Sequence, residues 1–274
     1  TAVGAHVVVR GVRVQVAELG RVAVVAGVDR GRGLGQAEQV EQLRGRGREG
    51  EAIATLDGFV QRARGLQEKE AEARDQLDLK EGRASDLKKE LKGLQKGQQR
   101  LADLVGLAFS RKRVTEPHMR LWRAAVYAWG QMGPYGSKGL WKVFGDKRFN
   151  KDVEFRALVV KQIGETRDYS QASKMIDMLD SKDEIVIAAT GEALAQWGEV
   201  RRKIVGRAVV ILDADYNAAT NINDTTANRI YRTIHEPLIR ALSALTGQSF
   251  RDPLDWTRWW NKNKKNPEAW KDPS

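Results

Sequence analysis

The sequence predicts an all-α protein in which a long coiled-coil helix is followed by an α-solenoid of helix-turn-helix repeats. Two patterns lead to this prediction. Apolar residues recur with a period of 34 residues through the second half of the chain, and a heptad pattern of apolar residues fills the segment before it. A period in this range, with helical spacing in both halves, is typical of stacked helical pairs.

Three glycines mark the period: Gly130, Gly164 and Gly198. Apolar residues keep the same offsets from each glycine, and they form one stripe per repeat. Such a stripe is too small to close a core by itself, so neighbouring repeats are expected to stack over residues 115–250. The repeat-equivalent apolar residues include Ala125, Val159 and Ala193, then Val126, Val160 and Leu194, then Trp129, Ile163 and Trp197, then Met119, Val153 and Ile187, and, after the glycines, Trp141, Met175 and Val209, then Phe144, Met178 and Leu212.

Three stretches of these repeats resemble the first-helix pattern of the HEAT-repeat family. They read RAAVYAWG at residues 123–130, FRALVVKQIG at 155–164 and AATGEALAQWG at 188–198. The resemblance implies a helical binding scaffold and no particular chemistry. The second helices keep less of the pattern, because Lys174 and Asp177 stand where the first repeat has Leu140 and Val143. The number of repeats beyond three is therefore left open.

The C-terminal residues 251–274 are expected to form a tryptophan-rich cap and tail. The sequence LTGQ at residues 245–248, followed by Trp256, Trp259 and Trp260, is similar to the close of many bacterial HEAT-repeat proteins of unknown role. A terminal segment that covers the open end of the repeats would explain the clustered tryptophans.

Residues 51–109 are predicted to form the coiled-coil helix. From Ala52 to Ala108, apolar residues follow one another in alternating steps of four and three, which is the spacing of a heptad seam. Glu70, Lys80 and Gln98 are polar seam positions that could specify the register. Several glycines off the seam each cost about 1 kcal/mol of helix stability relative to alanine. The helix is therefore expected to need a partner, either a second copy through residues 52–108 or another surface, and pairing in cis or in trans is left open.

Residues 1–50 differ in composition from the rest of the chain. They are rich in Val, Gly and Arg and contain no lysine, since the first lysine of the chain is Lys69. We interpret them as a low-complexity leader without stable structure. A second interpretation is that they arise from translation upstream of the true start, so whether they belong to the native protein is left open.

Composition limits the classes of function. The chain has 274 residues, of which 41% are hydrophobic and 30% charged, and it contains no cysteine, so disulfides and thiol chemistry are excluded. No apolar run approaches the length of a transmembrane helix. The net charge of +11 favours acidic partners, although Lys and Arg are interleaved with Asp and Glu, as on a solvated surface. A cytoplasmic location is favoured, with export left open if the N-terminus is misassigned.

One spacing matches a calcium-binding loop. Asp213, Asp215, Asn217 and Asp224 stand at positions 1, 3, 5 and 12 of such a loop, but Ala218 replaces the glycine that its sharp turn needs. Ordinary capping and loop roles are the favoured interpretation of these residues. No arrangement of residues predicts a catalytic site or a bound cofactor.

The leading functional hypothesis is a non-enzymatic protein–protein interaction scaffold, with the coiled coil as an oligomerisation or docking arm. The alternative is a nucleic-acid-binding protein in which basic residues contact phosphates and tryptophans stack on bases. The residues of this alternative are Arg111, Lys112 and Arg113, and Trp256, Trp259, Trp260, Lys262, Lys264 and Lys265. A role without nucleic acid is also open to them, since the first three residues would complement the dipole of the preceding helix and the tryptophans would form the terminal cap.

Overall fold

A computed structural model describes residues 39, 49–79, 83–198, 201–266 and 269–270. Every regular element in these residues is a helix, which confirms the predicted all-α class. The chain divides into two compact units, Thr1–Gly139 and Leu140–Ser274. The predicted leader, residues 1–50, lies almost wholly outside the described residues; the first long helix, α3, already begins at Glu49.

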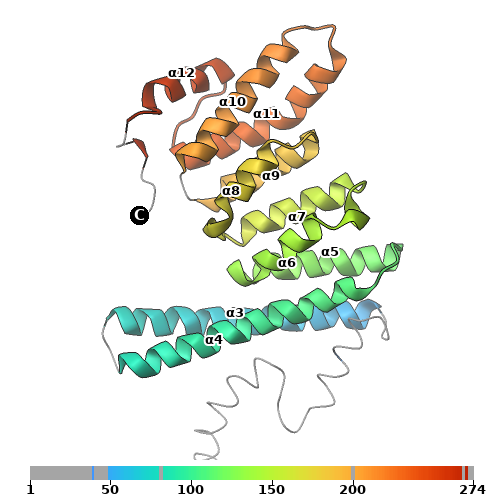
Figure 1. The fold of residues 1–274 in the computed structure, drawn as a ribbon, viewed down its shortest axis with the longest axis vertical. Coiled ribbons are helices and arrows are strands. Elements are labelled where there is room, and N and C mark those ends of the chain that lie inside the picture. Colours follow the sequence, from blue (N-terminus) through green and yellow to red (C-terminus); the bar gives the residue numbers. More distant parts are fainter. Residues whose placement is uncertain (1–38, 40–48, 80–82, 199–200, 267–268, 271–274) are drawn as a thin grey trace, which may run out of the picture. The chain divides into compact units, whose positions relative to one another are not determined.

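The N-terminal unit is built on a helical hairpin. Its elements are α3 (Glu49–Asp78), α4 (Ala84–Val105), the short η1 (Gly106–Ser110), α5 (Glu116–Gln131) and the start of α6 (Pro134–Phe144). In Figure 1, α3 and α4 run side by side, and α3 also contacts α5. Thr115 caps α5 as its sequence predicts, with its side chain accepting a hydrogen bond from the backbone N–H of His118.

The prediction of one continuous coiled-coil helix over residues 51–109 is wrong. The segment forms two helices, α3 and α4, that pack against each other within the same chain. A single helix would leave its apolar seam in water, whereas folding back buries that seam against α4 and α5. The seam that the predicted homodimer would use is therefore covered in cis. The buried seam residues are Ala52, Leu56, Phe59, Ala63, Leu66, Glu70, Ala73, Leu87, Leu94, Gln98, Leu101, Val105 and Ala108.

Two polar seam residues meet inside this hairpin. The Glu70 carboxylate accepts hydrogen bonds from Gln98 Nε2 at 2.5 Å, Arg74 Nη2 at 2.6 Å, Tyr135 OH at 3.0 Å and Gln95 Nε2 at 3.2 Å. Burial acts to raise the pKa of Glu70, but the donors outweigh it and the pKa is lowered. The network joins α3 to α4 and to the start of α6.

Aromatic stacking closes the other end of the N-terminal unit. Phe109 stacks on Trp122 and Trp129, with ring centroids 6.0 and 5.2 Å away and nearly parallel planes. The indole N–H groups of Trp122 and Trp129 donate to the carbonyl oxygens of Ala108 and Ala102, at 3.0 and 2.8 Å. Both tryptophans are buried, which confirms the packing role that the repeat pattern predicts for Trp129.

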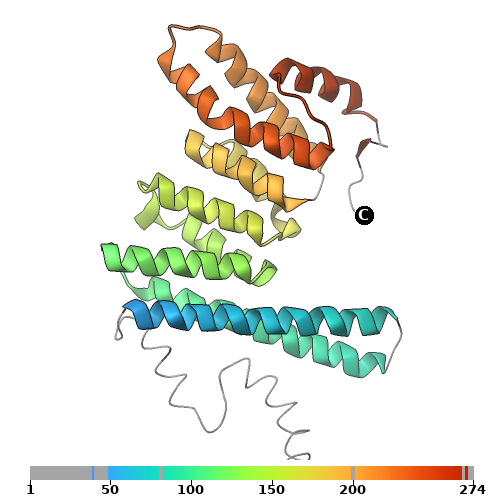
Figure 2. The ribbon, with the colours of Figure 1, turned by 180° about the vertical axis from the view of Figure 1, so that it is seen from behind.

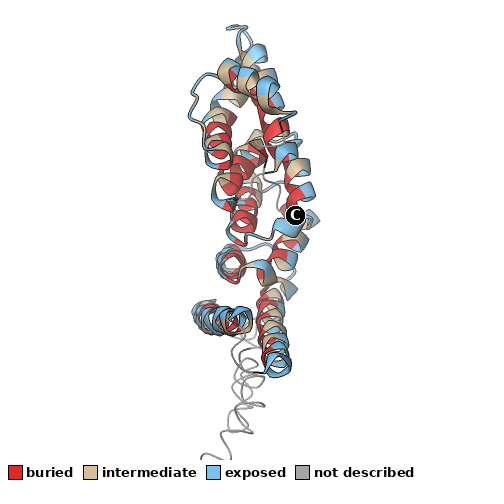
Figure 3. Ribbon diagram, turned by 90° about the vertical axis from the view of Figure 1, so that its left-hand side faces the viewer, coloured by how far each residue is buried: buried red, intermediate tan, exposed pale blue. Residues whose placement is uncertain are grey.

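The C-terminal unit arranges its helices in two layers. Its elements are η2 (Lys147–Phe149), α7 (Val153–Glu165), η3 (Tyr169–Gln171), α8 (Ala172–Leu179), α9 (Glu184–Trp197), α10 (Arg202–Ala219), α11 (Thr225–Thr246) and α12 (Pro253–Asn263). Helix α9 packs between α7 and α11 in one layer, and α8 and α10 form the other (Figures 1 and 2). Buried residues line the facing sides of these helices (Figure 3).

Most of the predicted repeat positions that belong to the C-terminal unit are buried in its core. The set that includes Val159 and Ala193, and the set that includes Val160 and Leu194, are at most 1% exposed. The repeat glycines serve different purposes. A Cβ on Gly164 would lie 2.6 Å from Ala193 Cα, so this glycine lets α7 approach α9, whereas Gly198 ends α9 in the left-handed conformation at φ +77°.

A proline inside a helix usually breaks or kinks it, but α11 runs through Pro237 without a break. The neighbouring helix makes room there. A Cβ on Gly191 of α9 would lie 2.8 Å from the carbonyl carbon of Pro237, so the two backbones approach more closely than any side chain would allow. Gly247 ends α11 in the left-handed conformation, as its sequence predicts.

Candidate interaction surface

The candidate site lies at the turn between α10 and α11, in the C-terminal unit. The Asp224 carboxylate caps α11 by accepting from the N–H of Ala227 at 2.9 Å. The Asn228 side chain donates to the carbonyl oxygens of Asn221 and Asp224, at 3.0 and 2.8 Å, and so holds the turn on the helix. These local bonds form because Asn and Asp readily bond nearby backbone groups.

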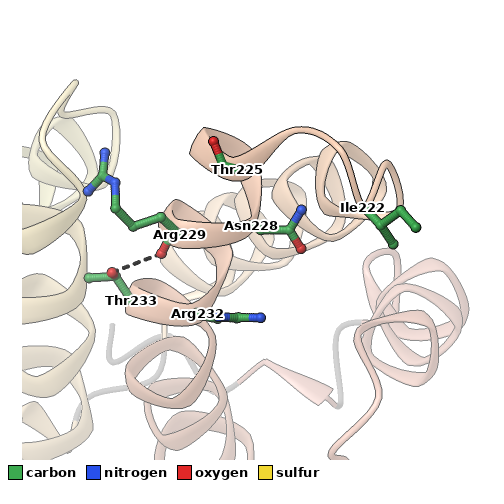
Figure 4. A pocket seen from close by; sticks show the side chains of 6 residues that line it. All are labelled: Ile222, Thr225, Asn228, Arg229, Arg232 and Thr233. Atoms are coloured by element: carbon green, nitrogen blue, oxygen red, sulfur yellow. Dashed lines mark hydrogen bonds between the residues drawn. The ribbon is translucent and has the colours of Figure 1, made fainter.

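A hollow of about 480 Å³ opens beside this turn, and we call it the turn hollow (Figure 4). It is lined by Ile222, Thr225, Asn228, Arg229, Arg232 and Thr233. Ile222 is 83% exposed at its rim, although it is a large apolar side chain. The Thr233 hydroxyl is occupied, since it donates to the carbonyl oxygen of Arg229 at 3.0 Å.

The two arginines of the turn hollow differ in their partners. Arg229 forms an ion pair with Glu184 of α9, which fixes its guanidinium toward the neighbouring helix. Arg232 is exposed, and within the described part of the chain it forms neither an ion pair nor a side-chain hydrogen bond. The turn hollow therefore offers one uncompensated cation beside one exposed apolar side chain.

A second, smaller hollow of about 250 Å³ lies among the α8–α9 turn, α10 and α11. Its apolar lining includes Ile187, Ile211 and Ile230. Burial raises the pKa of Asp215, which also lines it. The hollow contains an internal ion pair as well, because Arg207 binds Asp180.

Ion pairs compensate the charges along the α7–α9–α11 layer. Glu192 of α9 pairs with Lys161 of α7 at 2.5 Å and with Arg240 of α11 at 3.8 Å. Partly exposed pairs of this kind contribute little to stability. Their effect is to leave Arg232 as a distinct positive group on α11.

The residues of the calcium-loop alternative do not form one loop. Asp213, Asp215 and Asn217 lie within α10, where a helical period places Asp213 and Asp215 about 200° apart. Asp213 accepts hydrogen bonds from Thr257 at 3.0 Å and Asn217 at 3.4 Å, and Asp224 serves as the α11 cap. No group of three metal-ligating side chains is present among the described residues. The loop spacing does not apply, because α10 continues to Ala219.

The tryptophans of the nucleic-acid alternative contact the protein itself. Trp256 is 0% exposed and donates its indole N–H to the carbonyl oxygen of Phe250 at 3.0 Å. Trp259 and Trp260 pack edge-to-face on Trp270, with centroids 5.7 and 5.5 Å apart. Trp260 also lies against α10, where a Cβ on Gly206 would meet its ring at 2.5 Å. Trp256 therefore cannot stack on a base.

The basic residues of that alternative are dispersed. Lys262 lies in the last turn of α12, and Lys264 and Lys265 follow closely, with Lys264 Nζ donating to Asn261 at 2.7 Å. The other cluster lies between η1 and α5, in the N-terminal unit rather than the C-terminal one. This cluster consists of Arg111, Lys112 and Arg113. Burial lowers the pKa of Arg111.

Sequence reasoning missed the turn hollow. Ile222 stands in the polar stretch TNINDTT at residues 220–226, and a large apolar residue inside such a turn is the signal that would have identified it. Arg229 and Arg232 are three residues apart, which places both on one side of α11.

Comparisons of the chain with protein-family models, with curated proteins and with solved structures find no match. None of the described helices combines the length and the apolar character needed to cross a lipid bilayer.

Proposed function

We propose that this chain is a non-enzymatic protein-binding scaffold whose C-terminal unit is a HEAT-like solenoid. Two observations support the architecture. Within the C-terminal unit, most residues at equivalent places in the 34-residue period are buried, and α7, α9 and α11 lie in one layer with α8 and α10 in the other. The α3–α4 hairpin is the docking arm in this proposal, and it would dock through its outer surface because its apolar seam is covered within the chain.

The turn hollow is the docking site for the partner in this proposal. The observation that carries it is the pairing of an 83%-exposed isoleucine with an arginine that lacks a partner among the described residues. Arginine is enriched at protein interfaces, and an apolar side chain beside it supplies apolar surface that is buried on binding. The complementary partner is a protein segment with a carboxylate for Arg232 and an apolar residue for Ile222.

Site-specific photo-crosslinking tests this function. The full chain, carrying a benzophenone amino acid at position 222, is irradiated in its native cells, and adducts are identified by mass spectrometry. Leu254, 37% exposed on α12, is the matched control position. We expect an adduct at position 222 that position 254 does not give.

Charge reversal supplies the specificity control. Arg232→Glu removes the proposed carboxylate contact, whereas Arg251→Glu makes the same charge change on an exposed residue outside the turn hollow. We expect the adduct to fall at least tenfold with Arg232→Glu and to persist with Arg251→Glu. Equal adduct yields in the two variants would contradict the proposed site.

A further inference from the structure

A row of four cations runs along the outer side of α4. Lys88, Lys92, Lys96 and Arg100 follow one another at intervals of four residues, and all four are exposed. At 1.5 Å per residue the row is about 18 Å long, with a cation about every 6 Å. We call it the α4 ridge.

The α4 ridge faces away from the hairpin seam. Leu87, Leu94 and Leu101 form the buried stripe of α4. At about 100° per residue, Lys96 lies about 180° around the helix from Leu87. The ridge is thus presented to solvent by the same packing that buries the stripe.

The charges of the ridge are not compensated. None of its four side chains forms an ion pair or a hydrogen bond with a residue that the structure describes. Successive cations four residues apart repel each other and destabilise a helix. Asp103 follows the row by one turn but accepts a hydrogen bond from Gln99 instead. The chain therefore keeps three like-charge pairs, two of which a glutamate at position 92 would relieve.

We propose that the α4 ridge binds the phosphate backbone of duplex nucleic acid, independently of the turn hollow. Lysine ammonium groups are compact charges suited to phosphates, and a duplex carries a phosphate charge about every 1.7 Å of its axis. Each step of four residues turns the row by about 40° around α4, so the four cations follow a shallow spiral along the helix. Such a row can neutralise about four phosphates without reading any base.

The chemistry of α4 disfavours other polyanions. Its sequence contains no aromatic residue, and aromatic side chains are what single-strand binders stack on bases. A membrane-surface helix would need to insert its apolar face, which α4 buries inside the hairpin. Lysine is depleted at protein interfaces, which argues against an acidic protein.

The test is the salt dependence of binding to a fluorescent 20-base-pair DNA duplex, measured by anisotropy with the full chain. Neutralising four phosphates gives a slope of log K against log salt of about −3.6 from the ridge alone. That slope is about a 150-fold loss of affinity between 50 and 200 mM NaCl. A duplex RNA of equal length is expected to show the same ridge-dependent slope, because the contacts carry no sequence information.

Two variants with equal net charge separate the ridge from the general basic surface. K88Q/K92Q/K96Q/R100Q removes the ridge, and K147Q/K151Q/K182Q/K203Q removes four exposed lysines of the C-terminal unit. We expect the ridge variant to make the slope shallower by about 3.6 and the control to change it by less than about 1. Circular dichroism should show no loss of helix in the ridge variant, because like-charge repulsion is relieved.

Three outcomes would overturn the proposal. The first is no duplex binding at 50 mM NaCl, and the second is an equal change of slope in both variants. The third is ridge-dependent binding to phosphatidylserine vesicles, or to polyglutamate, without binding to either duplex. A folded ridge variant whose slope of log K against log salt is unchanged would also overturn the proposal, because other residues would then account for the salt dependence.

Discussion

Replacing the polar pair of the α3–α4 seam tests how this hairpin is held together. Glu70 is 6% exposed and Gln98 is 1% exposed, and Gln98 Oε1 has no hydrogen-bond partner. Glu70→Leu removes the acceptor of the Gln98 amide and leaves both ends of that amide buried without a partner. Arg74 is affected less, because its side chain is 60% exposed and can return to water.

The magnitude follows from which donors can be rehydrated. A buried polar group left without a partner costs about 1–3 kcal/mol, so Glu70→Leu should lower the local free energy of opening by about 2 kcal/mol. Gln98→Leu should cost about 1 kcal/mol, because Glu70 keeps its other donors. The double variant replaces both polar groups by apolar ones and should lie within about 1 kcal/mol of the original chain.

Hydrogen exchange of peptides from α3 and α4, measured in the full chain, gives these opening free energies locally. The expected coupling between the two substitutions is about 2 kcal/mol. Glu72→Leu is the matched control, since Glu72 is exposed on the same helix and should not couple to Gln98→Leu. If the effects of Glu70→Leu and Gln98→Leu simply add, within about 0.5 kcal/mol, the polar pair does not act as a unit and the reasoning is wrong.

Three further predictions concern pH, packing and capping. The lowered pKa of Glu70 gives stability that is present above its ordinary pKa near 4.5 and lost as pH falls below it, and hydrogen exchange of α3 peptides at acid pH checks this. The raised pKa of Tyr135 gives stability that is lost as pH rises above 10, and the tyrosinate absorbance at alkaline pH checks that. Gly164→Ala should lower stability by about 1–3 kcal/mol in urea titrations, because its Cβ would overlap α9, while Gly58→Ala, with open space around it, should raise stability by up to about 1 kcal/mol. Asp224→Ala should cost about 1 kcal/mol and speed exchange in the first turn of α11, and unchanged exchange there would contradict its capping role.

Periodicity predicted the buried faces well, because it reports which residues leave water. The seam residues and the repeat-equivalent residues are largely buried. What periodicity could not give was the partner of each face. A heptad seam looks the same whether it is covered by a second chain or by the next helix, and the break between Asp78 and Ala84 decides between them here.

The alternative site assignments failed where a sequence spacing did not show the helix that contains it or how far a residue is exposed. Asp213 and Asp215 match the spacing of a calcium loop, but they lie within α10, which ends at Ala219. Packing was the favoured interpretation of the tryptophans, and Trp256 is fully buried while Trp259 and Trp260 are partly buried. Ile222 carried too little local signal, because its exposure depends on how the turn lies over α11.

The hairpin explains how α4 can carry a row of like charges. An isolated helix with three repelling pairs and glycines at positions 93 and 97 would be weak in water. In this chain α4 is held by its buried leucines and by the Glu70 network rather than by its own propensity. Loosening the network and removing the ridge should therefore act differently on duplex binding. Glu70→Leu keeps all four cations, so it should lower the affinity at every salt concentration without changing the slope. Removing the ridge charges should change the slope itself, because the slope counts the phosphates that the protein neutralises.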